Sequence, residues 1–108
     1  MWHIASENLF VTLTSGMGSI ADNTSGGSIA YRSSKAAVNM VTVMLANELR
    51  GTGILVNAAD PGNCATDMGG WDAPRTPAEG AAVAVRLATL GSDAATGEVH
   101  AEAGRLPW

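Results

Sequence analysis

The sequence has little cysteine and few basic residues. Cys64 is the only cysteine, which excludes an intramolecular disulfide and a metal site built from several cysteines. Ten acidic residues outnumber six basic ones and give a formal net charge of −4. Proteins that bind nucleic acid usually carry the opposite charge balance. We therefore expect no nucleic-acid partner.

Long apolar segments are also missing. No run approaches the ~18 residues that a membrane-spanning helix needs. Residues 1–5 lack the basic start and the apolar stretch of a secretory signal. We therefore expect a cytoplasmic protein without membrane contact. The 108 residues, 46% of them apolar, fit one domain, so residues 1–108 are expected to form a single unit.

Alternating short strands and helices can be predicted along the chain. Apolar and β-branched runs predict strands at residues 9–14, 54–58 and 97–101. A helix is predicted over residues 28–50, because this segment has no internal proline or glycine and is followed by Gly51-Thr52-Gly53. Glycine-rich stretches at residues 15–27 and 61–77 predict loops.

A second helix is predicted to begin after Thr76. Thr76 fits the N-cap position, Pro77 the first helical position and Glu79 the third, which is the capping-box pattern. The helix should end near residue 90. Parallel neighbouring strands need crossover connections, so the order strand–helix–strand–helix–strand predicts an α/β fold with a parallel sheet. Three strands are few, so the fold is either minimal or has an open sheet edge that pairs with another chain.

The first predicted helix carries two apolar stripes at helical spacing. A helix that covers a small sheet needs only one. We interpret the outer stripe as a contact with a partner subunit; the alternative is one wide buried face. The first stripe contains Ser34, Val38, Val41, Leu45 and Leu49, and the second contains Ala37, Met40 and Met44.

Tyr31 and Lys35 are the strongest candidates for chemistry. They are the only tyrosine and the only lysine, and their spacing places them on one helix face. A free phenol ionises near pH ~10, and a positive charge nearby favours the phenolate. The pair could therefore act as a general acid and base, with Ser15 holding a substrate oxygen. The alternative is an ordinary surface tyrosine and lysine on an amphipathic helix.

Several motifs together resemble one enzyme family. A strand ends at Ser15, and Tyr31-x-x-x-Lys35 opens a helix. Val56-Asn57 then precedes Pro61-Gly62, and Thr66-Asp67-Met68 follows. This order resembles the C-terminal half of the short-chain dehydrogenase/reductase family across nearly the whole chain. The loop between Ser15 and Tyr31 is longer than is usual in that family.

The resemblance implies a fold, a reaction and a set of site residues. The implied fold is the C-terminal half of a Rossmann-like, doubly wound parallel sheet. The implied reaction is hydride transfer between NAD(H) or NADP(H) and a small carbonyl or alcohol substrate, without a metal. Ser15, Tyr31 and Lys35 would be catalytic. The implied cofactor-binding residues are Tyr31, Lys35, Pro61, Gly62 and Thr66.

The family's N-terminal motifs are not found in this sequence. These are a glycine-rich turn, the residue that selects the adenosine ribose, and an Asn-Asn-Ala-Gly segment. Residues 16–21 do fit Gly-x-Gly-x-x-Gly/Ala. However, that motif needs a helix N-terminus facing the pyrophosphate, and residues 22–27 are unsuited to a helix. We interpret residues 16–27 as a loop.

A partner should therefore complete the cofactor site. We expect a partner chain or a homo-oligomer, formed through the first helix or the open sheet edge. One alternative function is a catalytically silent half-domain that acts as an oligomeric binding module. Another, less favoured, is a hydrolase with Ser15 as nucleophile, for which no Gly-x-Ser-x-Gly elbow is present. His3, His100 and Cys64 are isolated, and Asp60, Asp67 and Asp72 suit turns better than a metal site.

Overall fold

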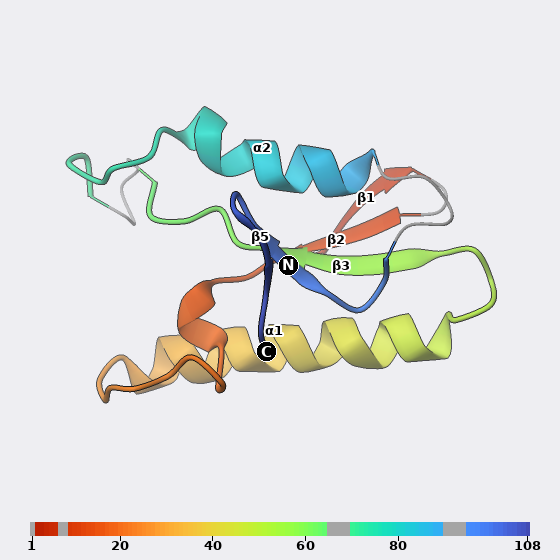
Figure 1. Cartoon of the computed structure of the whole chain (residues 1–108), viewed down its shortest axis with the longest axis horizontal. Helices are drawn as coiled ribbons and strands as arrows, with labels where there is room; N and C mark the ends of the chain where they lie inside the picture. Colours follow the sequence, from red (N-terminus) through yellow and green to blue (C-terminus); the bar gives the residue numbers. More distant parts are fainter. Residues whose placement is uncertain (1, 7–8, 65–69, 90–94) are drawn as a thin grey trace.

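The computed structural model describes residues 2–6, 9–64, 70–89 and 95–108. Five strands, two α-helices and one short 3₁₀ turn make up the described chain (Figure 1). In order they are β1 (Trp2–Ser6), β2 (Leu9–Leu13), η1 (Gly16–Gly18), α1 (Ile29–Glu48), β3 (Leu55–Ala59), α2 (Pro77–Ala88), β4 (Val99–Ala101) and β5 (Gly104–Leu106). None of the described helices is long and apolar enough to span a membrane.

The strands form one mixed sheet in the order β1-β2-β3-β4-β5. β2, β3 and β4 are parallel to one another, as the sequence predicts. β2 and β3 pair residue for residue, from Leu9 opposite Leu55 to Leu13 opposite Ala59. The outer strands β1 and β5 are antiparallel to their neighbours and lie outside the predicted strands. The α/β class is confirmed, and the sheet is wider than its three predicted strands.

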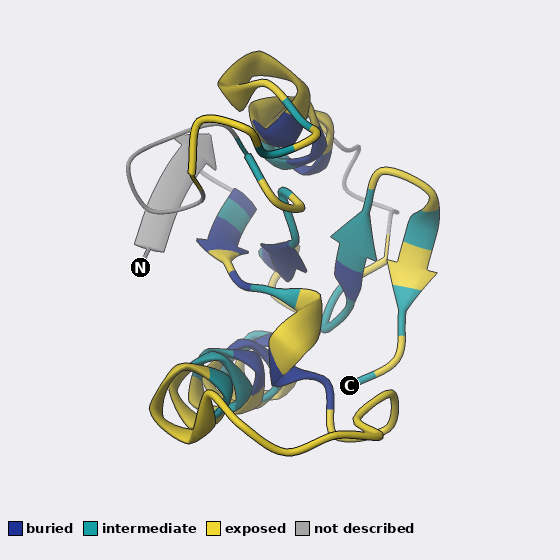
Figure 2. Ribbon diagram, turned by 90° about the vertical axis from the view of Figure 1, so that its left-hand side faces the viewer, coloured by how far each residue is buried: buried dark blue, intermediate teal, exposed yellow. Residues whose placement is uncertain are grey.

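The two helices cover opposite faces of the sheet (Figure 1). α1 packs on β2 and β3 from one side, and α2 packs on the same two strands from the other. Burial follows these layers, since the central strands and the inner sides of the helices are the buried parts (Figure 2). The apolar core beneath α2 contains Val11, Ala59, Val83 and Leu87.

The interface between α1 and the sheet is polar, which corrects the predicted buried face. The buried residues of α1 are Asn39, Thr42 and Ala46. Thr42 Oγ1 lies 2.9 Å from Thr12 Oγ1, and Thr14 Oγ1 donates to Asn39 Oδ1 at 2.5 Å. Because buried polar groups need partners, these pairs hold the side of α1 that carries Asn39 and Thr42 against the sheet. The stripe predicted to cover the sheet lies beside that side of the helix, with Ser34 and Val41 exposed and Val38, Leu45 and Leu49 half-buried.

η1 packs closely against the first half of α1. A Cβ atom added to Gly18 would lie 2.8 Å from the carbonyl carbon and the Cβ of Lys35 and 2.9 Å from the backbone nitrogen of Ala36. Glycine is therefore required here for space, since real Cβ atoms do not approach backbone this closely. The contact brings the chain after β2 against the turn of α1 that carries Lys35.

α2 begins with the predicted capping box. Thr76 Oγ1 accepts a hydrogen bond from the Glu79 backbone N–H at 3.1 Å, and Glu79 Oε1 accepts one from the Thr76 N–H at 2.9 Å. The Thr76 N–H holds the pKa of Glu79 below its usual value of 4.5, assisted by the Thr76 hydroxyl and by Arg75. A carboxylate whose pKa is lowered by folding stabilises the fold at pH values above its pKa in the unfolded chain. This stabilisation is lost as the pH falls through the pKa of the folded protein.

We expect Thr76→Ala to lower the free energy of unfolding by about 1 kcal/mol, because the N-terminal N–H groups of α2 lose their acceptor. Urea unfolding followed by circular dichroism measures the difference. Thr76→Ser keeps the hydroxyl and should stay close to the parent protein. Equal stabilities for the alanine and serine variants would contradict the capping role.

We expect Gly18→Ala to destabilise the fold by roughly 1–3 kcal/mol, because the new methyl group must displace the Lys35 backbone. Gly26→Ala is the matched control, since a Cβ at Gly26 would meet no atom within 4 Å. Thermal unfolding of the two variants compares them directly. If both variants lose the same stability, close packing of η1 on α1 does not explain the loss in Gly18→Ala.

Candidate active site

The candidate residues gather at one edge of the sheet. Ser15 follows β2, Asp60-Pro61-Gly62 follows β3, and η1 packs against α1 at the level of Lys35. The Thr14 N–H donates to the Ala59 carbonyl at 2.9 Å, which continues the pairing of β2 and β3 to their carboxyl ends. In open α/β sheets, ligands bind beyond the carboxyl ends of parallel strands. This edge is therefore the candidate active site.

Ser15 begins the turn η1 and caps it. Its Oγ accepts a hydrogen bond from the Met17 N–H at 3.1 Å, and its carbonyl accepts one from the Gly18 N–H at 2.9 Å. Ser15 is half-buried. Because the capping bond uses a lone pair of Oγ, the hydroxyl hydrogen remains available to a ligand oxygen.

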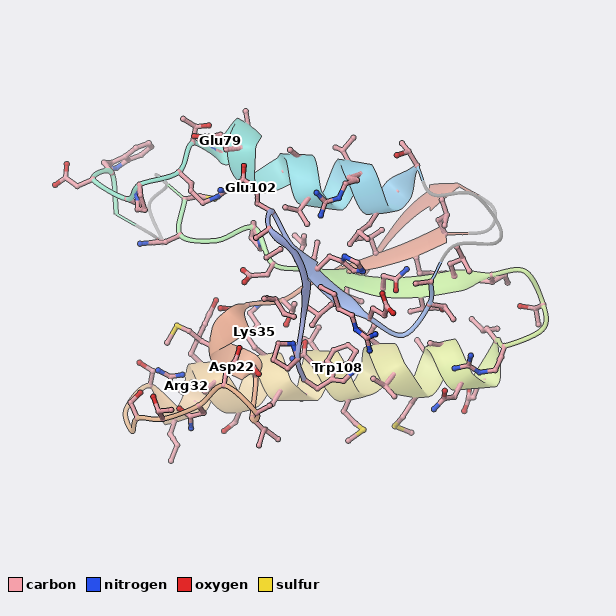
Figure 3. All side chains as sticks on the ribbon, in the orientation of Figure 1. Asp22, Arg32, Lys35, Glu79, Glu102 and Trp108 are labelled. Carbon is pink, nitrogen blue, oxygen red and sulfur yellow. The ribbon has the colours of Figure 1, made fainter. Side chains whose placement is uncertain are left out.

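Tyr31 and Lys35 lie one turn apart on α1 and contact each other. The Lys35 Nζ lies 5.7 Å from the centroid of the Tyr31 ring. Figure 3 shows Lys35 on the N-terminal half of α1, the half that carries η1. The Tyr31 side chain is 38% exposed and Lys35 is half-buried. Among the residues that the structure describes, no carboxylate forms an ion pair with Lys35.

The Pro61-Gly62 loop is held by two charged side chains. The Pro61 carbonyl accepts from Arg75 Nε at 3.0 Å, and the Gly62 N–H donates to Asp60 Oδ1 at 2.9 Å. Gly62 has φ +75° and a Cβ there would lie 2.6 Å from Arg75 Cδ. Glycine is thus favoured by the conformation, and a side chain there would displace Arg75. Thr66, the remaining predicted cofactor residue, lies outside the described residues.

Asp60, for which the sequence predicts only a turn, also lies at this edge of the sheet. Its Oδ2 accepts from the Gly16 N–H at 3.1 Å, from a residue 44 positions earlier in the chain. The spacing Asp-x-Gly could have indicated the local bond to Gly62. The bond to Gly16 joins two loops that only the fold brings together.

The run Gly16–Ala21 does not fit a pyrophosphate. Its first four N–H groups donate to Asp60, to Ser15 Oγ, to the Ser15 carbonyl and to the Gly16 carbonyl. An anion would therefore find these donors occupied and a carboxylate beside them. These bonds agree with the prediction that residues 16–21 are not a dinucleotide site. The residues at this edge fit the nicotinamide end of a cofactor instead, because Ser15, Tyr31 and Lys35 offer a hydroxyl, a phenol and a cation there.

Other candidates are engaged elsewhere. His100 Nε2 lies 2.9 Å from Glu98 Oε1, so this histidine is paired with a carboxylate. No group of three metal-ligating side chains occurs within the described ranges; Asp67 lies outside them. A hollow of about 520 Å³ opens between residues 17–27 and α1, bordered by Ile20, Ile29 and Arg32, and Ser15, Tyr31 and Lys35 do not line it.

The chain resembles known proteins in both sequence and structure. C-signal of Myxococcus xanthus is 51% identical over 61 residues, which are 56% of this chain and 37% of that protein. The carbonyl reductase Sniffer of D. melanogaster superposes with a TM-score of 0.79 at 35% identity, over 91% of this chain and 40% of that one. The NADPH-bound carbonyl reductase from chicken fatty liver gives 0.77 at 31% identity, over 91% and 39%.

These relatives are longer than the present sequence, which spans less than half the length of each. The match to the family itself covers most of the chain. Residues 9–75 fit the family model described as short chain dehydrogenase, and this range contains every candidate site residue. The chain belongs to the short-chain dehydrogenase family.

Proposed function

We propose that this chain carries the catalytic residues of a short-chain oxidoreductase that acts on a small carbonyl or alcohol substrate with NAD(H) or NADP(H). The observation that carries this proposal is the Lys35 ammonium 5.7 Å from the Tyr31 ring centroid. A cation beside the ring can stabilise the negative charge that forms on the phenol when its proton is transferred to a substrate. The bound nicotinamide supplies or accepts the hydride.

The proton and the substrate oxygen are handled by three side chains. In the reducing direction, the Ser15 hydroxyl donates a hydrogen bond to the substrate carbonyl oxygen. As the carbonyl carbon gains a hydride, negative charge grows on that oxygen, and Tyr31 transfers its phenolic proton to it. The product is an alcohol, and Lys35 stabilises the phenolate that remains. In the oxidising direction the phenolate takes the proton back.

We propose that this chain binds the nicotinamide end of the cofactor. Tyr31 and Lys35 would hold its ribose, and Pro61, Gly62 and Thr66 would lie along the nicotinamide. The occupied N–H groups of residues 16–19 support a pyrophosphate site elsewhere. We therefore propose that a partner chain or a second copy supplies the rest of the cofactor site.

Self-association is proposed to use the outer face of α1. Met40 and Met44 are 60% and 54% exposed, and Ala37 and Val41 beside them are exposed as well. A continuous apolar stripe of this kind is typical of a surface that packs against another subunit. The sheet edge at β5 is less suitable, because that strand has three residues and Pro107 follows it.

We expect Tyr31→Phe to lower kcat for carbonyl reduction by about 10²–10⁴-fold, because the ring keeps its place and only the transferable proton is lost. Oxidation of NADPH in the presence of a panel of aldehydes and ketones, followed by absorbance, measures kcat. Ser33→Ala, a hydroxyl deletion on the same helix, is the control and should retain activity. Undiminished turnover in the phenylalanine variant would exclude Tyr31 as the acid and base.

We expect Met44→Glu to shift the protein from an oligomer towards a monomer, because a charge placed in the apolar stripe opposes its burial. Val85→Glu is the matched control, since Val85 is 61% exposed on α2 and lies outside the stripe. Sedimentation velocity reports the oligomeric state of all three proteins. A monomeric parent protein, or equal dissociation by both substitutions, would contradict association through α1.

A further inference from the structure

The Asp60 carboxylate joins the two loops of the candidate active site. One oxygen, Oδ2, accepts from Gly16 in the turn after β2 at 3.1 Å. The other, Oδ1, accepts from Gly62 in the loop after β3 at 2.9 Å. Hydrogen bonds to an ionised acceptor are among the stronger ones in proteins. A single side chain thus connects the segment of Ser15 to the segment of Pro61 and Gly62.

The loop after β3 is the fixed side of this connection. The Asp60 N–H donates to the His100 carbonyl at 2.8 Å, which anchors the residue to β4. Arg75 holds the adjacent Pro61 carbonyl from the other side through Nε. Arg75 also donates to the Glu79 carbonyl at 2.9 Å and forms an ion pair with Glu102. In Figure 3, Glu79 and Glu102 lie on the same side of the sheet, next to the start of α2.

The turn that contains Ser15 packs on α1 and has few hydrogen bonds to the β3 side. Its hydrogen bonds run mostly within the turn itself, from Met17 and Gly18 to Ser15 and from Ser19 to the Gly16 carbonyl. Its ties to the β3 side are the bond from Thr14 to Ala59 and the bond from Gly16 to Asp60. Gly16 is suited to the second tie, because a Cβ there would already lie 3.2 Å from Asp60 Oδ2. Without the carboxylate, the turn beyond Thr14 would lose its bond to the neighbouring loop.

We propose that Asp60 is a positioning residue, which sets the Ser15 hydroxyl relative to the Pro61-Gly62 loop by binding the N–H groups of Gly16 and Gly62 together. The role of this geometry in catalysis rests on the proposed function, since the Ser15 hydroxyl is there assigned to the substrate oxygen and the Pro61-Gly62 loop to the nicotinamide. The physical link itself does not depend on turnover.

Amide hydrogen exchange of the 108-residue chain tests the link without an activity assay. In Asp60→Ala, the Gly16 and Gly62 N–H groups lose their acceptor, and we expect both to exchange about 10-fold faster or more. Asp72→Ala is the matched control, because it removes an exposed carboxylate from the same loop region and should leave both rates unchanged. Unchanged exchange at Gly16 in Asp60→Ala overturns the proposal.

A conservative variant keeps this test decisive if Asp60→Ala does not fold. Asp60→Asn offers one acceptor oxygen where the carboxylate offers two. We therefore expect faster exchange at one of the two glycines and near-parent exchange at the other. Parent-like protection of both glycines in this variant would overturn the proposal as well.

Kinetics separates a positioning role from a general loss of structure. We expect Asp60→Ala to lower kcat by roughly 10–100-fold, as a displaced catalytic group does, and to change the KM for NADPH by less than about 3-fold, because Arg75 still holds Pro61. In a Ser15→Ala background the same substitution should cost no further activity, since its effect acts through Ser15. An equal loss in both backgrounds would overturn the positioning role.

The two proposals can fail independently in this design. If the parent chain shows no turnover with any carbonyl substrate while Asp60→Ala accelerates exchange at Gly16, the proposed function fails and the link between the loops stands. If turnover is present and exchange at Gly16 is unchanged, the function stands and the link fails.

Discussion

The polar contact between β2 and α1 determines where the candidate catalytic residues stand. Thr12 meets Thr42, and Thr14 donates to Asn39. Apolar side chains tolerate small shifts along a helix, whereas buried hydroxyl and amide groups find their partners in only one register. Each buried polar group left without a partner costs about 1–3 kcal/mol. A displacement of α1 along the sheet would break both pairs. Thr12 and Thr42 each have a backbone carbonyl as a second acceptor, so the buried Thr14–Asn39 pair favours this register most.

The register of α1 also sets the positions of Lys35 and Tyr31, because the side of the helix that meets the sheet continues through them towards the N-terminus. Asn39 and Thr42 lie on the face of α1 that meets the sheet. Lys35 is one turn before Asn39, and Tyr31 is one turn before Lys35. The docking of α1 therefore brings the turn that carries Lys35 to the carboxyl edge of the sheet, where Gly18 packs directly on the Lys35 backbone. The loops after β2 and β3 are then joined at that edge by Asp60.

Features that arise from local chemistry could be predicted from the sequence. The capping box of Thr76 and Glu79, the end of the first helix before Gly51 and the spacing of Tyr31 and Lys35 each depend on residues a few positions apart. The buried face of α1 could not be predicted by counting apolar residues, because Asn39 and Thr42 are buried through hydrogen bonds to another element. The bond from Asp60 to Gly16 spans 44 positions and depends on the pairing of β2 with β3. β5 was missed because Gly104-Arg105-Leu106 contains no β-branched or aromatic residue that would indicate a strand.

One helix can serve both catalysis and association because its two sides are separate. Successive residues of an α-helix are turned by about 100°, so Met40 and Met44 project roughly opposite to Lys35. A second copy that packs on this outer stripe would not cover the phenol or the ammonium. Its binding would instead add stability to α1, which carries both groups. Groups that complete a cofactor site must come from a different direction, towards the sheet edge where Ser15, Asp60 and Gly62 meet. Under the proposed function, the outer stripe is thus suited to hold α1 in place, and the sheet edge is suited to receive the ligand.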